Sequence, residues 1–208
     1  MTPTLREALV NEVRDLYHAE KQLVRALPRL TKSTNSPDLR HALTSHLEET
    51  ERQVERLEGV FEQLGERAQP KPCEGMSGIL KEGFASIGDG FDGDVADAAI
   101  IAAAQRVEHY EIAAYGTAAA WAKALGLTEV ETLLAETLGE EKAADKKLTS
   151  LAEHGINAAA THGSEGESMS ADSEAGGAER NSRRSRPSAN GRSRSLKSSR
   201  SATRQRSR

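Results

Sequence analysis

The sequence predicts an all-α protein whose folded part is a four-helix bundle. Aromatic residues make up only 3% of the 208-residue chain, while Ala, Leu and Glu are abundant, and this composition favours packed helices over a sheet. Four stretches each carry an apolar heptad seam, with hydrophobic side chains recurring every three or four residues. Each seam is interrupted near its midpoint by a carboxylate or an imidazole.

These polar interruptions are the most informative feature of the chain. The four seams are Val13, Leu16, Glu20, Leu23, Leu27, Leu30; Leu43, His46, Thr50, Gln53, Leu57, Val60, Leu64; Ala98, Ile101, Gln105, Glu108, Ile112, Tyr115, Ala119; and Val130, Leu134, Thr137, Glu141, Ala144, Leu148, Leu151. Burying one unpaired carboxylate is costly. Several carboxylates at the middle of different helices therefore indicate a cationic centre, as in bundles built round a pair of metal ions.

Capping signals predict where the helices begin. Thr2-Pro3 and Ser36-Pro37 each combine an N-cap residue with a proline at the first helical position. Asp92 or Asp94 is a candidate cap for the third helix, and Thr128 with Glu131 has the spacing of a capping box.

Glycines predict where the helices end. Gly65, Gly126 and Gly155 stand where C-caps are expected, and Pro28 should kink the first helix or end it early. Together these signals predict helices over residues 3–33, 37–64, 94–125 and 129–154.

The connections predict the topology. The first and second helices, and the third and fourth, are joined by short segments, so each pair should form an antiparallel hairpin. Residues 65–93 form a long crossover that contains Met76–Leu80 and Phe84, and we expect a short helix there. Two hairpins joined by a long crossover are the ferritin-like arrangement.

Composition divides the chain into a bundle at residues 1–156 and a tail at 157–208 that we expect to be disordered. Residues 161–179 are rich in Gly, Ser and Glu, and Arg180–Arg208 contains 11 of the 28 basic residues and no acidic one. Such a tail could contact nucleic acid without sequence preference, or it could fold back on the acidic bundle or add solubility. The candidate nucleic-acid contacts are Arg183, Arg184, Arg186, Arg192 and Arg194.

Other functional classes are disfavoured. The chain has no run of 18 apolar residues that would cross a membrane, and Met1–Glu12 does not resemble a secretory leader, so a cytoplasmic protein is expected. Cys73 is the only cysteine, which excludes an intrachain disulfide. No nucleophile elbow or phosphate-binding glycine loop stands out.

The candidate metal ligands lie on all four predicted helices. Iron and manganese favour carboxylate oxygens with one or two imidazoles, and side chains three or four residues apart share a helix face. The candidates are Glu20, His46, Glu49, Glu108, Glu111, Glu141 and Asp145. Gln53 and Gln105, one turn away from candidate ligands, are expected to hydrogen-bond to them.

Each candidate could instead have a purely structural role, without binding metal. The seam glutamates could be solvated or paired with nearby cations, and His46 could be an ordinary core histidine. Glu49 and Glu111 flank their seams rather than lie in them, and Asp145 is close to Lys142 and Lys146. For Tyr17, Tyr110 and Tyr115, core packing is favoured over a role in holding carboxylates.

Several segments resemble the YciE/YciF group of bacterial stress-response ferritin-like proteins. The similar segments cover about residues 4–156 and are 15–23, 46–50, 53–58, 73–76, 104–116 and 140–145. The resemblance implies a dimeric ferritin-like bundle with a di-iron or di-manganese centre, related in architecture to rubrerythrin and manganese catalase. It implies no particular reaction, because the group is defined by its induction under stress.

The chain departs from the usual ferritin-like ligand pattern at two positions. Such sites commonly place a histidine three residues after the glutamate of the second and fourth helices, but here those positions hold Arg52 and Ala144. Glu108 and Glu111 resemble the paired glutamates on the third helix of rubrerythrins. A carboxylate-rich site with at most one histidine is therefore expected.

Three functional hypotheses follow. The first is a di-metal protein that reacts with peroxide or oxygen in stress protection, and the resemblance implies that it is a homodimer. The second is an iron-storage cage. The third is a non-enzymatic, stress-associated protein whose bundle is structural and whose basic tail contacts nucleic acid.

Overall fold

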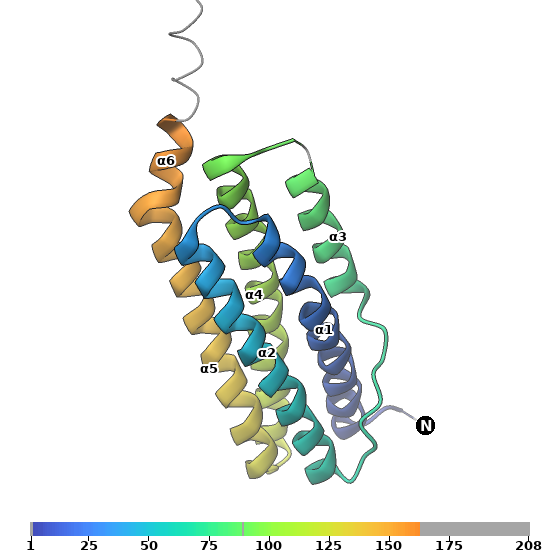
Figure 1. Ribbon diagram of the computed structural model, residues 1–208. Helices are drawn as coiled ribbons and strands as arrows, with labels where there is room; N and C mark the ends of the chain where they lie inside the picture. The colour runs from blue at the N-terminus through green and yellow to red at the C-terminus, as the bar shows by residue number, and fades with distance from the viewer. Residues whose placement is uncertain (1, 89, 163–208) are drawn as a thin grey trace, which may run out of the picture. The chain divides into compact units, whose positions relative to one another are not determined.

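The computed structural model describes residues 2–88 and 90–162, and it confirms the predicted all-α class (Figure 1). Its elements are α1 (Leu5–Ser33), α2 (Pro37–Leu64), α3 (Glu74–Gly88), α4 (Gly93–Ala124), α5 (Thr128–Leu151), the π-helical segment η1 (Ala152–Ile156) and α6 (Asn157–His162). The tail arginines proposed to contact nucleic acid lie outside the described residues.

The helices pack in the predicted ferritin-like order. The hairpin of α1 and α2 lies against the hairpin of α4 and α5, with α2 packed on α5 and α1 packed on α4. The crossover between the hairpins contains the predicted short helix, α3, which packs on the outside of the bundle against α4 and α1 (Figure 1). No helix in the described ranges is long and apolar enough to cross a membrane.

The predicted boundaries of α2 are confirmed. The Ser36 side chain accepts a hydrogen bond from the Leu39 backbone N–H, and Pro37 occupies the first turn. The helix ends at Gly65, whose φ of 66° lies in the left-handed region that glycine adopts without strain.

Two predicted N-caps are wrong. The first helix is capped by Thr4, not Thr2, because Thr4 and Glu7 exchange the two hydrogen bonds of a capping box. In α5 the N-cap position is Leu127, and Thr128 is already helical and makes no side-chain cap.

One predicted helix end is confirmed and another is wrong. The α1 helix ends at Ser33, as predicted, and runs through Pro28, with Leu27 and Leu30 buried on either side of the proline, so Pro28 does not end it early. Gly155 lies inside η1 and is not a C-cap, and the chain stays helical to His162, beyond the predicted helix end at residue 154. Burial of Ala152 and Ile156 holds this last segment against the bundle, so packing outweighs the local glycine signal.

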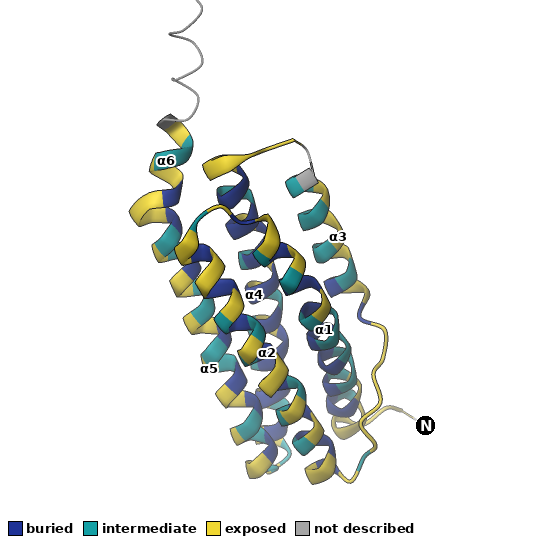
Figure 2. Cartoon of the chain, in the orientation of Figure 1, coloured by how far each residue is buried: buried dark blue, intermediate teal, exposed yellow. Residues whose placement is uncertain are grey.

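The core consists of two apolar clusters with a polar layer between them. Figure 2 shows the buried residues along the inner faces of the helices. One cluster includes Leu9, Val13, Phe61 and Leu134, and the other includes Leu23, Leu43, Ile100 and Leu148. The buried polar side chains between the clusters are Glu20, His46, Thr50, Gln53, Glu108, Glu111, Thr137 and Glu141. The interruptions of the predicted seams therefore meet at one level of the bundle.

Candidate metal centre

Four polar side chains converge at the middle of the bundle. His46 on α2, Glu108 and Glu111 on α4, and Glu141 on α5 each present a ligand atom, and these atoms all lie within 4.8 Å of one another. The three glutamates are at most 1% exposed and His46 is 7% exposed. We refer to these four residues as the central cluster.

Glu20 joins this layer from α1. It is fully buried, and its Oε1 accepts a hydrogen bond of 2.5 Å from the Tyr115 hydroxyl. Its charge acts on both Glu108 and Glu111 across the layer, which places it beside the central cluster. Tyr115 therefore packs in the core, as the sequence favoured, and also holds a carboxylate.

Glu111 points inward, although the heptad pattern placed it at the flank of its seam. Its helix, α4, is packed against α1, α3 and α5, so the buried surface of α4 is wider than one seam. Glu108 and Glu111, three residues apart, consequently share the buried face.

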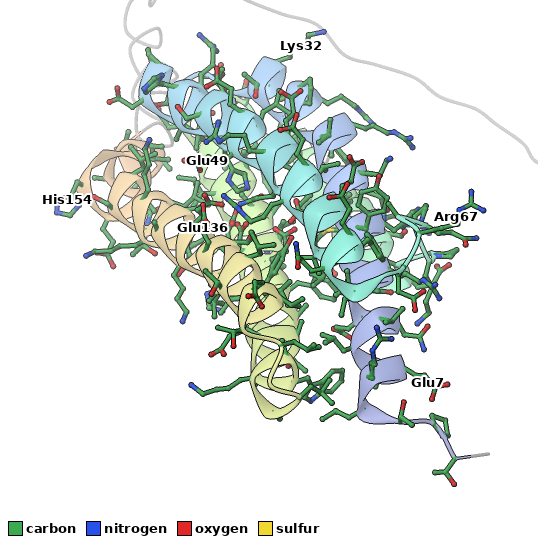
Figure 3. The ribbon with its side chains drawn as sticks, turned by 90° about the horizontal axis from the view of Figure 1, so that it is seen from below. Glu7, Lys32, Glu49, Arg67, Glu136 and His154 are labelled. Carbon is green, nitrogen blue, oxygen red and sulfur yellow. The ribbon has the colours of Figure 1, made fainter. Side chains whose placement is uncertain are left out.

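His46 connects the central cluster to a more exposed carboxylate. Its Nε2 lies 3.4 Å from Glu108 Oε1, and its Nδ1 lies 3.8 Å from Glu49 Oε2. The Glu49 side chain is 38% exposed, and in the view of Figure 3 it lies between α2 and α5. Contact with His46 is the main reason that the pKa of Glu49 is lowered. Glu49 therefore approaches the histidine from the solvent side and lies outside the central cluster.

Asp145 also lies at the edge. Its side chain is 24% exposed, accepts a 3.0 Å hydrogen bond from Gln105 Nε2, and lies 3.4 Å from His109 Nε2. Gln105 donates a second hydrogen bond of 2.9 Å to Thr149. Gln105 therefore hydrogen-bonds to a candidate ligand, Asp145, as predicted. Asp145 itself lies outside the central cluster.

Gln53 supports the centre directly. Its Nε2 donates to Glu141 Oε1 at 2.5 Å and to Glu140 Oε2 at 3.0 Å. Glu140 is in turn bound by Arg56, which also pairs with Glu136 at 2.8 Å.

The sequence analysis missed Arg56. Its side chain bridges α2 and α5, and the only sequence signal was its position three residues after Gln53.

The centre is unusual for its unpartnered polar atoms. Buried polar groups are normally hydrogen-bonded, and leaving one without a partner costs about 1–3 kcal/mol, more for a charged group. Eight of the nine such side-chain atoms in the described ranges belong to this layer: Glu20 Oε2, Gln53 Oε1, Glu108 Oε2, both carboxylate oxygens of Glu111, Glu141 Oε2 and both ring nitrogens of His46. Carboxylate oxygens and imidazole nitrogen are the donors that iron and manganese prefer, so this donor set fits a metal site.

The electrostatics agree with this interpretation. Desolvation is the main cause that raises the pKa of Glu20 and of Glu141 to about 7 and that of Glu108 to about 8. Desolvation and the neighbouring glutamates raise the pKa of Glu111 well above its ordinary value. Burial alone would lower the pKa of His46, but the surrounding carboxylates, Glu108 first, outweigh it and raise that pKa to about 9. Without a cation the layer retains protons, and a bound cation would replace them.

Comparisons with known proteins agree with the fold. Residues 4–161 match the family described as a domain of unknown function, DUF892. The chain is 44% identical to the protein YciF of Escherichia coli K12 over 155 residues, which cover 74% of this chain and 93% of that protein.

Solved structures agree as well. The crystal structure of the E. coli stress protein YciF superposes with a TM-score of 0.72 at 44% identity, covering 75% of this chain and 99% of that one. YcfI from Rhodopseudomonas palustris gives a TM-score of 0.70 at 45% identity, covering 71% of this chain and 94% of that one. The family match spans every member of the central cluster, and the chain belongs to the DUF892 family.

Proposed function

We propose that this protein binds a pair of iron or manganese ions in the polar layer and acts in protection against stress. The observation that carries the proposal is the convergence of buried carboxylate oxygens and imidazole nitrogens that have no hydrogen-bond partner. A bundle selected for stability alone would place leucine at these positions, because apolar side chains would pack there without desolvation cost.

The charges favour two ions over one. Glu20, Glu108, Glu111 and Glu141 carry four negative charges when ionised, which two divalent cations would balance. These four glutamates and His46 are the proposed ligands, while Gln53 and Tyr115 orient Glu141 and Glu20 by hydrogen bonds. Glu49 and Asp145, at the edge, are candidates for additional ligands. Such ions would supply redox chemistry with peroxide or dioxygen.

One relative supports the biological context. A homologous protein, YciF of E. coli, is described as a stress protein, which favours a protective role over metabolic turnover. The homodimer remains a prediction, as does the alternative of an iron-storage cage. Nucleic-acid contact through the tail also remains a prediction, because the residues involved lie outside the described ranges.

Elemental analysis of the protein produced with added iron and manganese tests the proposal. We expect about two metal ions per chain in the wild type, as in other carboxylate-bridged bundles. A Glu108→Gln, Glu141→Gln double variant should lose nearly all the metal, because two anionic donors are removed while side-chain volume is kept.

The matched control is Glu48→Gln, which changes an exposed glutamate on α2 two residues from His46. This control should retain the wild-type metal content. A double variant that keeps the metal, together with normal helicity by circular dichroism, would rule out the assigned ligands.

A further inference from the structure

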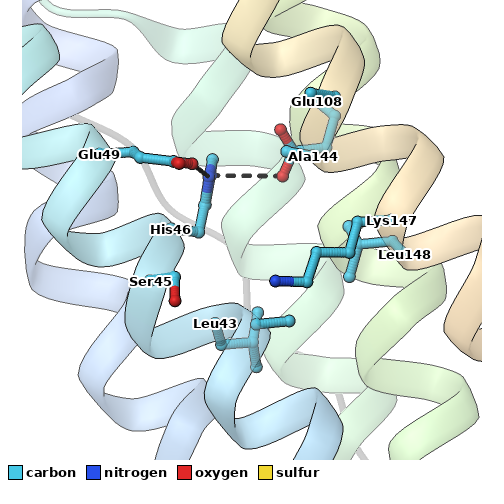
Figure 4. Close-up of a pocket in the computed structure, with 10 residues that line it drawn as sticks. Leu43, Ser45, His46, Glu49, Glu108, Ala144, Lys147 and Leu148 are labelled. Atoms are coloured by element: carbon cyan, nitrogen blue, oxygen red, sulfur yellow. Dashed lines mark ion pairs between the residues drawn. The ribbon is translucent and has the colours of Figure 1, made fainter.

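A cavity leads from the surface to one side of the centre (Figure 4). It lies between α2 and α5 and has a volume of about 110 Å³. The side chains at its inner end are His46 and Glu108, both buried, whereas Ala143 and Lys147 are exposed at its outer end. A single water needs on the order of 10–15 Å³ of such volume. The cavity therefore has room for a small molecule beside the central cluster.

Ala144 is the residue that leaves this space open. It lies three residues after Glu141, so both side chains share one face of α5, and it lines the cavity. A longer side chain at this position would project into the space next to His46 and Glu108. In the fourth predicted seam, the carboxylate of Glu141 is thus followed one turn later by a methyl group too short to fill the gap.

The walls select for a ligand of low charge. Ala42, Leu43, Ala143, Ala144 and Leu148 make most of the lining apolar, and an ion would lose hydration on passing them. Near the outer end, Glu49 is negative and Lys147 is positive, so the two charges offset each other and the entrance favours neither anions nor cations. Figure 4 shows the Lys147 side chain reaching from α5 toward α2 on the side of Leu43 and Ser45.

The inner end offers a place to bind. Both ring nitrogens of His46 and Glu108 Oε2 are buried without a hydrogen-bond partner. His46 and Glu108 would hold a metal ion at this end of the cavity, and the short Ala144 side chain would leave room beside them for a ligand from outside.

We propose that this cavity is the entrance through which an uncharged molecule of two or three non-hydrogen atoms reaches the metal centre, and that Ala144 keeps it open. The inference rests on the proposed function and deepens it, because it names the ligand class and the side of the centre on which the ligand binds. Dioxygen and hydrogen peroxide belong to this class.

Binding of nitric oxide to the ferrous-loaded protein, followed by stopped-flow absorbance without oxygen, tests the inference. Nitric oxide has two non-hydrogen atoms and gives a spectral change on ferrous iron that requires no turnover. Ala144→Leu should slow its binding on the order of tenfold or more, a barrier increase of at least about 1.4 kcal/mol. Ala143→Leu, at the exposed rim, is a second variant that alters the outer end with little risk to folding.

The matched control is Ala135→Leu, the same substitution at an exposed position of α5 that does not line the cavity. It should bind nitric oxide at the wild-type rate.

Elemental analysis of every variant separates this proposal from the previous one. If Ala144→Leu and Ala143→Leu both hold wild-type iron and bind nitric oxide at the wild-type rate, the entrance is elsewhere. If the wild type takes up neither iron nor manganese, the proposed function is overturned, and this inference with it.

Discussion

At the residue scale, the buried carboxylates are positioned by a few specific donors. The Tyr115 hydroxyl donates to Glu20, and the Gln53 amide donates to Glu141, each at 2.5 Å. These contacts satisfy one oxygen of each carboxylate and leave the other free. Each carboxylate is thus held by one oxygen, and its other oxygen is available to bind a cation.

Tyr115→Phe should weaken both the fold and the metal site. The substitution keeps the ring in the core but removes the donor to Glu20. We expect the metal-free protein to lose about 1–3 kcal/mol of unfolding free energy and metal affinity to fall about 10–100-fold. Urea denaturation and competition with a chelator measure the two effects.

The control for this substitution is Tyr17→Phe. Tyr17, on α1, is also buried, but its hydroxyl donates to the exposed Glu58, which water can solvate when the donor is lost. Its metal affinity should equal that of the wild type. Equal metal affinities for the two variants would show that Tyr115 does not position a ligand.

At the element scale, the crossover helix α3 is fixed to the bundle by close packing and hydrogen bonds. Tyr110 on α4 donates to Asp15 on α1 at 2.9 Å, and its oxygen lies 3.0 Å from the Cys73 sulfur. Cys73, just before α3, also donates its backbone N–H to His18. These contacts join α1, α4 and the crossover at Tyr110, which lies between Glu108 and Glu111 in the sequence of α4.

Gly75→Ala should destabilise this junction. A Cβ at residue 75 would lie 2.8 Å from a ring carbon of Tyr110, so the ring or the helix must move. We expect a loss of about 1–3 kcal/mol in the unfolding free energy, as for other overpacked sites. Thermal and urea denaturation would measure it.

Gly78→Ala, in the same helix, is the matched control. A Cβ there meets nothing within 4 Å, and alanine favours a helix over glycine by up to about 1 kcal/mol. We therefore expect opposite signs for the two substitutions. If Gly75→Ala is as stable as Gly78→Ala, the packing of α3 against Tyr110 is not tight in solution.

At the scale of the whole molecule, two apolar clusters stabilise the bundle and the polar layer between them opposes folding. The layer contains four buried carboxylic acids and an imidazole whose pKa values all rise on folding. Its contribution to stability therefore depends on what neutralises it, which is protons in the metal-free state and metal ions in the proposed loaded state.

The metal-free protein should lose stability as the pH rises. The glutamates start from an ordinary pKa of 4.5 and reach about 7 to 8 in the folded state, and His46 goes from 6.5 to about 9. Over this window the folded state binds more protons than the unfolded state, so the unfolding free energy falls from about pH 5 to about pH 9. Urea denaturation of the chelator-treated protein at several pH values measures this slope.

The metal-loaded protein provides the comparison. Protons compete with metal for the same oxygens and nitrogens, so the stability that metal adds should grow with pH over the same window. An apoprotein whose stability rises with pH would mean that these carboxylates are not buried as the structure places them.

Much of the fold follows from local sequence signals. The heptad seams, the Ser36-Pro37 start and the Gly65 end of α2 predicted the helices, because periodic burial and capping are read within a few residues. The errors at Thr4, Leu127 and Gly155 arise where packing or a neighbouring cap outweighed a local preference. The two short connections and the long crossover predicted the ferritin-like arrangement, the resemblance supplied the family, and the comparisons confirm that family.

The sequence by itself determined that carboxylates and one imidazole occupy the middle of the helical seams, because helical periodicity fixes which residues share a face. Only the tertiary structure decided which of them meet. It turned Glu111 inward, left Glu49 and Asp145 at the edge, and opened a cavity beside Ala144. The reason is physical: the rotation of each helix about its axis, and the number of neighbours that cover it, depend on contacts between segments far apart in the chain.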